Sequence, residues 1–185
     1  MSYGLCVINF HLINQIVPVL FTIRKATAED IPLIRELCYK VWPQTFASIL
    51  SQDKIDYMLE YMYSAGSLQK QMEEGSQFIF VYEGNEPVGY AAYFDKGHNI
   101  YKLDKIYVLP SQQGKGTGKF VIGYIVNEIR QKGATALQLQ VHRKNKARNF
   151  YEKLGFVIIE EKDFDIGQGF FMNDYVMEKQ LATGN

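Results

Sequence analysis

The sequence features that most directly suggest chemistry are three glycines that alternate with small or basic residues. Residues 112–119 read QQGKGTGK, and they lie between the apolar runs YVLP and FVIGYIV. Because glycine has no Cβ atom, backbone amides in such a loop can come close to a bound phosphate. A helix that starts there adds the positive end of its dipole. The spacing therefore predicts a phosphate-binding loop and leaves open which phosphate it binds.

Two common nucleotide-binding loops do not fit this stretch. A nucleoside-triphosphate loop follows G-x-x-x-x-G-K-[ST], which requires a glycine and a hydroxyl residue where the sequence has Gln113 and Phe120. A dinucleotide loop follows G-x-G-x-x-G in the first turn of a βαβ unit. Here the glycines occupy every second position and lie late in the chain. Both classes are therefore excluded.

The segments around the loop alternate between strand-like and helical hydrophobic patterns. Short apolar or alternating runs bounded by turn residues predict strands at residues 21–25, 77–83, 88–95, 100–109, 136–141, 156–163 and 169–178. Apolar residues at helical spacing predict helices at residues 31–41, 53–64, 66–74, 120–131 and 145–154. We expect Pro43 to end the first helix. The fold class is mixed α/β, and the crossover through the loop makes strands 100–109 and 136–141 parallel.

Length, charge and cysteine content restrict the class of protein. A chain of 185 residues can bury one sizeable core, so we expect a single domain at residues 21–180 and a short tail at 181–185. The formal net charge of zero provides no electrostatic footprint for nucleic acid. Cys6 and Cys38 lack metal-ligand spacing and suggest no disulfide framework. This favours a reduced, cytoplasmic setting and a protein without a metal.

The first 20 residues form an apolar extension, for which three interpretations remain open. Residues 1–23 contain no Lys, Arg, Asp or Glu, but the apolar run is interrupted by Asn9, His11, Asn14, Gln15 and Pro18. A transmembrane helix needs about 20 mostly apolar residues, and a signal peptide needs a positive start and a small-residue cleavage site. The segment is a packed or dispensable extension, a stretch upstream of the natural start, or, least in keeping with its polarity, a membrane anchor.

With the nucleotide loops excluded, the remaining pattern is Gln-x-x-Gly-x-Gly at residues 113–118, directly after a strand. It resembles the acyl-CoA pyrophosphate loop of the GCN5-related N-acetyltransferase (GNAT) superfamily. The segment NKARNFYEKLGF at residues 145–156 is similar to that family's downstream motif N-x-A-x-x-F-Y-x-x-x-G-F. The resemblance covers residues 21–179. It implies the GNAT fold, a central, mostly antiparallel sheet of about seven strands, splayed between the fourth and fifth strands and flanked by helices.

The resemblance also implies acetyl-CoA as the acyl donor. Its diphosphate would be held by the loop residues Gln113, Gly114, Lys115, Gly116, Thr117, Gly118 and Lys119. The remaining cofactor contacts would come from the backbone of Ile106, Tyr107 and Val108, facing the pantetheine and the thioester carbonyl, and from Asn145 and Arg148. Residues 115–153 contain nine basic and two acidic side chains, a local charge of +7 that suits an anionic cofactor.

Two side chains are candidates for the transfer step, in which an amine attacks the thioester directly and forms a tetrahedral intermediate. Tyr151 stands where the family's tyrosine stands, and a phenol of pKa about 10 can protonate a departing thiolate whose thiol has a pKa of about 8.5. Asp104 occupies a position where many family members carry an acid. Its pKa of about 4 makes it a poor direct base, so it would act through a water or orient the amine. The structural alternatives are a core tyrosine beside Phe150 and a surface pair between Asp104 and Lys102.

The acceptor pocket of this superfamily is built by the first two helices, the loop between them and the last strands. In this sequence those segments contain the aromatic residues Trp42, Phe46, Tyr57, Tyr61, Phe164 and Phe170, with acidic residues nearby. We assign Trp42, Phe46 and Tyr57 to substrate binding. Aromatic and acidic groups suit a cationic amine, and the arrangement resembles bacterial GNATs of the polyamine or diamine acetyltransferase type. We expect His98, in a turn, and His142, just past a strand, to be structural or incidental.

Other functions remain open from the sequence. The chain could be a protein or peptide N-acetyltransferase with an open groove, a CoA-binding regulatory module without turnover, or a membrane-tethered protein. A homodimer is possible, and no nucleic-acid partner is expected. Because members of this superfamily act on many different amines, the fold by itself does not choose among these functions.

Overall fold

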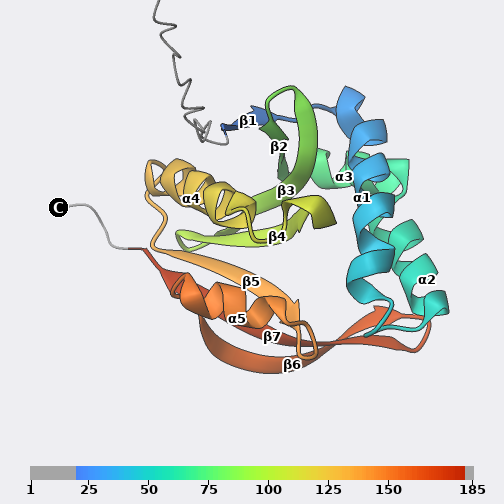
Figure 1. The fold of residues 1–185 in the computed structure, drawn as a ribbon. Helices are drawn as coiled ribbons and strands as arrows, with labels where there is room; N and C mark the ends of the chain where they lie inside the picture. The colour runs from blue at the N-terminus through green and yellow to red at the C-terminus, as the bar shows by residue number, and fades with distance from the viewer. Residues whose placement is uncertain (1–19, 182–185) are drawn as a thin grey trace, which may run out of the picture.

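The strands expected from the sequence form one open sheet in the order β1-β2-β3-β4-β5-β7-β6. The computed structural model describes residues 20–181 (Figure 1). Its strands are β1 (Phe21–Lys25), β2 (Gln77–Glu83), β3 (Glu86–Gly97), β4 (Ile100–Val108), β5 (Ala136–His142), β6 (Val157–Gly167) and β7 (Phe170–Gln180). Its α-helices are α1 (Ile31–Phe46), α2 (Gln52–Tyr63), α3 (Ala65–Glu73), α4 (Thr117–Arg130) and α5 (Ala147–Lys153). The expected extension and tail lie, apart from Leu20 and Leu181, outside the described residues.

Helices cover both faces of this sheet (Figure 1). On one face, α4 buries an apolar stripe that includes Val121 and Ile125 against side chains such as Leu139 of β5. On the other face, α1, α2 and α3 form a second core with β2 and β3, in which Ile34 and Phe80 are fully buried. In residues 20–181, none of the helices combines the length and the apolar character that crossing a membrane would require.

The sheet is splayed between β4 and β5, as expected. These two strands are parallel, but they pair only over residues 100–103 of β4 and 136–139 of β5. Beyond that point β4 stays paired with β3 as far as Val108, and β5 stays paired with β7 as far as His142. The facing edges of β4 and β5 therefore separate, and in the described part of the chain the backbone groups on those edges have no neighbouring strand.

A β-bulge in β4 lies where the two strands separate. Leu103 is opposite Tyr93 and Lys105 is opposite Ala92, so Asp104 is an extra residue without a partner on β3. One extra residue reverses the alternation of side chains along a strand. Leu103 accordingly faces the core under α4, whereas Lys105 lies over the ring of Tyr63 on the opposite face.

Two helix boundaries differ by three residues or more from the sequence-based expectation. Pro43 does not end α1, which continues to Phe46 because the rings of Trp42 and Phe46, 4.5 Å apart, are buried in the core and hold the last turn in place. Helix α4 begins at Thr117, three residues earlier than expected, with Gly116 as its N-cap. The glycine loop therefore runs directly into the first turn of α4.

A glycine on β3 sets how closely β3 can approach the end of β4 that has separated from β5. A Cβ atom added to Gly89 would lie 2.5 Å from the carbonyl oxygen of Tyr107. We predict that Gly89→Ala lowers the free energy of unfolding by about 2 kcal/mol, because overpacking forces the backbone of β4 to shift. Urea unfolding followed by circular dichroism measures the change.

The matched control is Gly123→Ala in the exposed interior of α4, where an added Cβ atom meets nothing within 4 Å. This substitution should raise the free energy of unfolding by about 0.5–1 kcal/mol, since alanine loses less backbone freedom in a helix. A Gly89→Ala variant as stable as the wild-type protein would contradict the tight approach of β3 and β4.

Candidate active site

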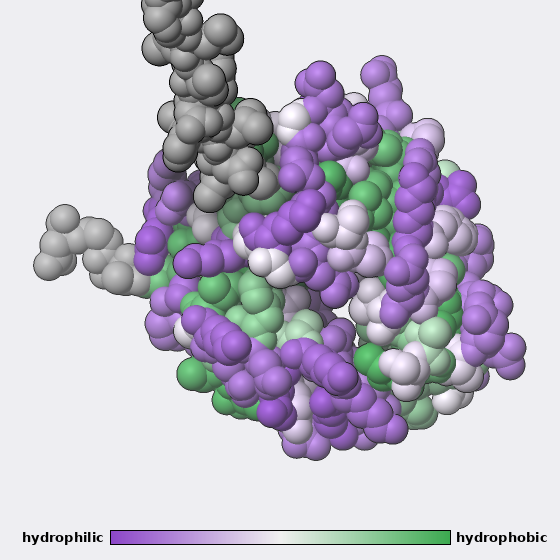
Figure 2. All heavy atoms as spheres, in the orientation of Figure 1, coloured by the Kyte–Doolittle hydropathy of each residue, from purple (hydrophilic) through white to green (hydrophobic). Residues whose placement is uncertain are grey.

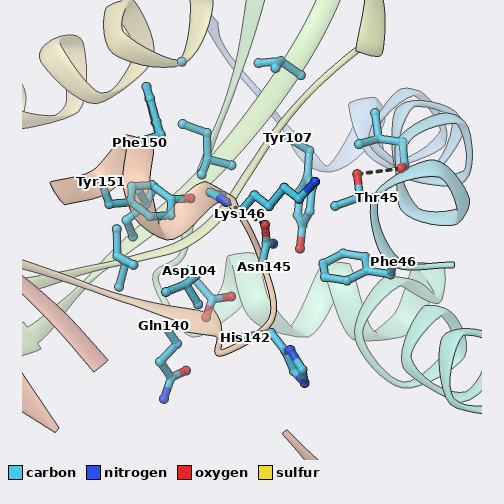
Figure 3. Close-up of a pocket in the computed structure, with 18 of the residues that line it drawn as sticks. Thr45, Phe46, Asp104, Tyr107, Gln140, His142, Asn145, Lys146, Phe150 and Tyr151 are labelled. Carbon is cyan, nitrogen blue, oxygen red and sulfur yellow. Dashed lines mark hydrogen bonds between the residues drawn. The ribbon is translucent and has the colours of Figure 1, made fainter. Parts of the chain in front are cut away.

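A cavity of about 1230 Å³ lies between the separated ends of β4 and β5. Its walls come from both strands, the glycine loop, the start of α5, the end of α1 and the β6–β7 hairpin. Figure 2 shows a hollow near the middle of this face, with hydrophilic side chains gathered around it. In Figure 3 the labelled side chains surround the cavity, and the hydroxyl of Tyr151 points into it. Segments far apart in the sequence thus meet at one site.

The glycine loop supplies backbone donors to one end of this cavity. Gly114 and Gly116 have left-handed φ angles of 81° and 88°, and a Cβ atom added to either would meet nothing within 4 Å. Because Gly116 is the N-cap of α4, the first amides of that helix have no partner within the helix. The positive end of the helix dipole lies at the same place. This combination fits the phosphates of a coenzyme.

A contact between the loop and β2 that the sequence analysis missed holds the loop in place. Gln112 is buried, and its side-chain amide donates to the carboxylate of Glu83. The Lys115 ammonium also forms an ion pair with Glu83, at an N–O distance of 3.6 Å. Lys115 therefore does not line the cavity. No sequence pattern links Glu83 to the loop, because β2 reaches it only through the folded sheet.

Of the other expected cofactor contacts, all but Arg148 line the cavity. The cavity wall includes Gln113, Gly114, Gly116, Thr117, Gly118 and Lys119 of the loop, Ile106, Tyr107 and Val108 of β4, and Asn145. Arg148 does not line it, because its guanidinium pairs with Glu152 at 3.4 Å and lies over the ring of Tyr175. Lys146 and Lys153, which we did not single out, line the cavity instead.

Tyr151 lies in the cavity wall on the second turn of α5. The helix begins where the side-chain oxygen of Asn145 accepts a hydrogen bond from the amide of Ala147 at 2.9 Å. The Tyr151 ring packs 5.3 Å from that of Phe150 and 5.9 Å from that of Phe156, measured between centroids. Burial raises the pKa of Tyr151 to about 12, so the phenol is protonated at neutral pH. It is therefore a potential proton donor and also a core residue.

Asp104 sits between two lysines. Its carboxylate lies 3.1 Å from the ammonium of Lys102 and forms a second ion pair with Lys105, which is only 2% exposed. Burial acts to raise the pKa of Asp104, but the two lysines outweigh it and hold that pKa below its ordinary value. The carboxylate lines the cavity as an ionised, doubly paired group, so it is suited to orienting a ligand and poorly suited to taking a proton.

The expected substrate residues are only partly exposed to the cavity. Trp42 and Phe46 line it, but both are buried and pack around the ring of Tyr107. Tyr57 does not line it, because its hydroxyl donates to the carbonyl of Ile166 at 2.5 Å and so ties α2 to the β6–β7 hairpin. Tyr61, one turn further along α2, reaches the cavity in its place.

A histidine and a buried aspartate that the sequence analysis did not assign to the site also line the cavity. His142 was expected to be incidental, yet it lies at the end of β5 with its Nδ1 accepting the amide of Lys144 at 3.2 Å. Burial, reinforced by Lys54, lowers its pKa. Asp174 lies opposite His142 on β7, and burial raises its pKa to about 6. Within residues 20–181, no group of three or more His, Cys, Asp or Glu side chains could hold a metal ion.

The splayed sheet and the glycine loop at the start of α4 are the features that the resemblance to the GNAT superfamily implied. A family model described as "Acetyltransferase (GNAT) domain" matches residues 46–178. The chain therefore belongs to the GNAT acetyltransferase family, as the loop and the NKARNFYEKLGF segment indicated.

Three of the similar proteins show the range of the comparison, two with long matches and one with a partial match. A spermidine N(1)-acetyltransferase of Thermoplasma acidophilum is 26% identical over 167 residues, which are 87% of this chain and 98% of that protein. The crystal structure of the PaiA N-acetyltransferase of the same organism in complex with coenzyme A aligns with a TM-score of 0.74 and 25% identity, covering 88% of this chain and 99% of that one. A ribosomal protein bS18-alanine N-acetyltransferase of Haemophilus influenzae is 33% identical over 97 residues, which are 51% of this chain and 64% of that protein, less than two thirds of its length.

The ion pair at the bulge predicts a stability effect. Asp104→Asn leaves the buried ammonium of Lys105 without its main partner, which should lower the free energy of unfolding at pH 7 by about 3 kcal/mol. Urea unfolding measures the loss. Adding Lys105→Met to this variant should restore much of it, because the uncompensated charge is then removed.

The control is Glu36→Gln, which breaks an exposed pair with Lys40 on α1. Exposed pairs at this helical spacing contribute about 0.5 kcal/mol or less. If Asp104→Asn is no more destabilising than Glu36→Gln, the bulge does not depend on the buried pair.

Proposed function

We propose that this protein is an N-acetyltransferase that moves an acetyl group from acetyl-CoA to a primary amine, preferably a small cationic amine such as a polyamine. The observation that carries the proposal is the cavity between β4 and β5, which has phosphate-binding groups at one end and titratable side chains along the rest of its wall. The long match to a spermidine N(1)-acetyltransferase supports the choice of amine. So do the aromatic rings of Phe46 and Tyr61 in the wall.

In this proposal the loop and α4 hold the diphosphate of acetyl-CoA. The first-turn amides of α4 donate to phosphate oxygens, with Lys119 as a charged partner. Gln113 and Asn145 extend the contact along the cavity wall. The excess of basic side chains in residues 115–153 attracts the anionic cofactor.

The separated edge of β4 positions the reacting carbonyl. The backbone N–H groups of Ile106 and Val108 point away from β3, on the strand edge that β5 has left, and are preset to stabilise the oxyanion that forms when the amine attacks. Tyr151 gives its proton to the departing sulfur. Asp104 orients the amine, since its two lysine partners keep it ionised. The transfer is a direct attack through a tetrahedral intermediate.

A second candidate is acetylation of a peptide N-terminus. It is favoured by the 33% identity to the bS18-alanine N-acetyltransferase over 97 residues. A peptide acceptor would lie along the cavity mouth between α2 and the β6–β7 hairpin, where Tyr61 and Phe164 line the wall.

A thiol-release assay with acetyl-CoA distinguishes these functions. The acceptors are spermidine, a diamine, lysine and a peptide that begins with alanine, each at several concentrations. We expect the highest kcat/KM for the polyamine. Release with the peptide alone would favour the second candidate, and tight CoA binding without release for any acceptor would show a binding module instead of an enzyme.

The role of Tyr151 gives a separate prediction. Tyr151→Phe should lower kcat by about 100-fold, because general acid catalysis typically contributes at least that factor. Affinity for CoA, measured by calorimetry, should stay within a factor of two or so of the wild-type value. The matched control is Tyr101→Phe, a buried tyrosine of β4 in the same core that does not line the cavity. Equal rates for Tyr151→Phe and Tyr101→Phe would show that Tyr151 only packs.

A further inference from the structure

Asp174 is a buried carboxylate at the cavity, and part of its hydrogen-bonding capacity is unused. The residue lies on β7, is 6% exposed and lines the cavity wall. Its Oδ1 atom is buried and has no hydrogen-bond partner among the residues that the structure describes. An unpaired buried acceptor costs stability, so its presence in a ligand cavity points to a partner that arrives with the ligand.

The sheet places Asp174 on the side of the cavity away from α4. Met177 of β7 belongs to the core under α4, and side chains alternate along a strand, so Asp174 faces the opposite side. His142 of β5 is its direct partner across the ladder, which sets their Cβ atoms about 5 Å apart. Asp174 thus lies in the part of the cavity opposite the phosphate loop, where an acceptor would enter.

The charges around Asp174 come from each element packed against it. Lys102 on β4, Lys54 on α2 and Arg143 after β5 act to lower its pKa, and Asp163 on β6 acts to raise it. Burial has the largest effect and leaves the pKa at about 6. Lys162, the ladder partner on β6, is 3.7 Å from Glu160 and so has a carboxylate of its own. Asp174 is therefore ionised at neutral pH and still basic enough to accept a proton.

We propose that Asp174 takes the proton from the acceptor amine, directly or through one water molecule. This assignment rests on the proposed N-acetyltransferase function and adds to it the base that the reaction needs. An amine that enters as an ammonium ion must lose a proton before its lone pair can attack the thioester.

The proton balance of the step is complete with Asp174 and Tyr151. Asp174 accepts one proton from the ammonium ion, and the freed lone pair forms the N–C bond. The C–S bond then breaks, and Tyr151 gives its proton to sulfur. The nitrogen still carries one excess proton, which passes to the Tyr151 phenolate and restores the phenol. Asp174 then releases its proton to solvent. The products are the acetylated amine, the free thiol and one proton.

Asp104 and His142, two other titratable groups in the wall, fit this role less well. Asp104 is held by two lysines and its pKa lies below the ordinary value, so it is a weaker base than Asp174. His142 has a lowered pKa, and its Nδ1 already accepts the amide of Lys144. A general base works best when its pKa lies near the working pH, and Asp174 meets this condition more closely than Asp104 does.

The test compares pH profiles of kcat/KM for the amine at saturating acetyl-CoA. For the wild-type protein we expect the profile to fall below an apparent pKa of about 6. Asp174→Asn should lower kcat/KM at pH 7.5 by about 100-fold and remove that limb, with CoA affinity unchanged. The matched control is Glu178→Gln, a carboxylate on the same strand that does not line the cavity, which should retain the wild-type profile.

A second variant guards against a purely structural effect. Asp174→Ala leaves space for a small carboxylate, so added formate should raise its rate at least tenfold, a response that a packing defect would not give. Two results would overturn the assignment while the proposed function stands. One is an Asp174→Asn variant as active as an active wild-type enzyme, and the other is a folded Asp174→Ala variant whose rate formate does not change. A wild-type protein without turnover for any amine overturns both.

Ionisation of Asp174 can also be followed without turnover. Because its pKa is higher in the folded protein than in the unfolded chain, stability decreases as pH rises from about 4 to about 6 and stays lower above that range. The Asp174→Asn variant has no carboxyl group to ionise at this position and so does not lose this stability. Its thermal midpoint relative to the wild type should therefore increase through the same window. A constant difference across it would show that Asp174 is not held as a poised base.

Discussion

The separation of β4 from β5 is the constraint on which the rest of the site depends. Two parallel strands that begin as neighbours stop pairing after residues 103 and 139, while each keeps its other partner in the sheet. Polar backbone on such an edge needs a hydrogen-bond partner, and in the proposed function a ligand in the cavity provides it. The same separation makes room for the loop at the start of α4 on one side and for the β6–β7 hairpin on the other (Figure 1).

The bulge at Asp104 connects this backbone geometry to the electrostatics of the cavity. It turns Lys105 onto the face of α1 and α2, where the buried ammonium requires a carboxylate, and Asp104 is the group that supplies it. Asp174, two strands away, has no such partner within residues 20–181, and burial shifts its pKa in the opposite direction. Two carboxylates of one cavity are thereby given different proton affinities, a common basis for dividing the work of an acid–base reaction.

Local patterns allowed much of the fold to be predicted from the sequence. The strands, the crossover through the loop and the motif around Tyr151 all depend on residues close together in the chain. The prediction that α1 ends at Pro43 was wrong, because core packing around Trp42 outweighs the break expected at the proline. The directions of Lys115 and Arg148 could not be predicted, since each follows a carboxylate whose position becomes defined only in the folded protein.

By itself the sequence indicated the family, through the resemblance of the loop and of residues 145–156 to GNAT motifs, and it determined the strands and the position of the glycine loop, because these follow from hydrophobic period and from glycine spacing over a few residues. The tertiary structure alone decided which side chains meet. Sheet order places β7 beside β5, so Asp174 comes to lie opposite His142, 32 positions away in the chain. Burial and the charge of neighbours set proton affinity, and both are properties of contacts between distant segments, which no short stretch of sequence contains.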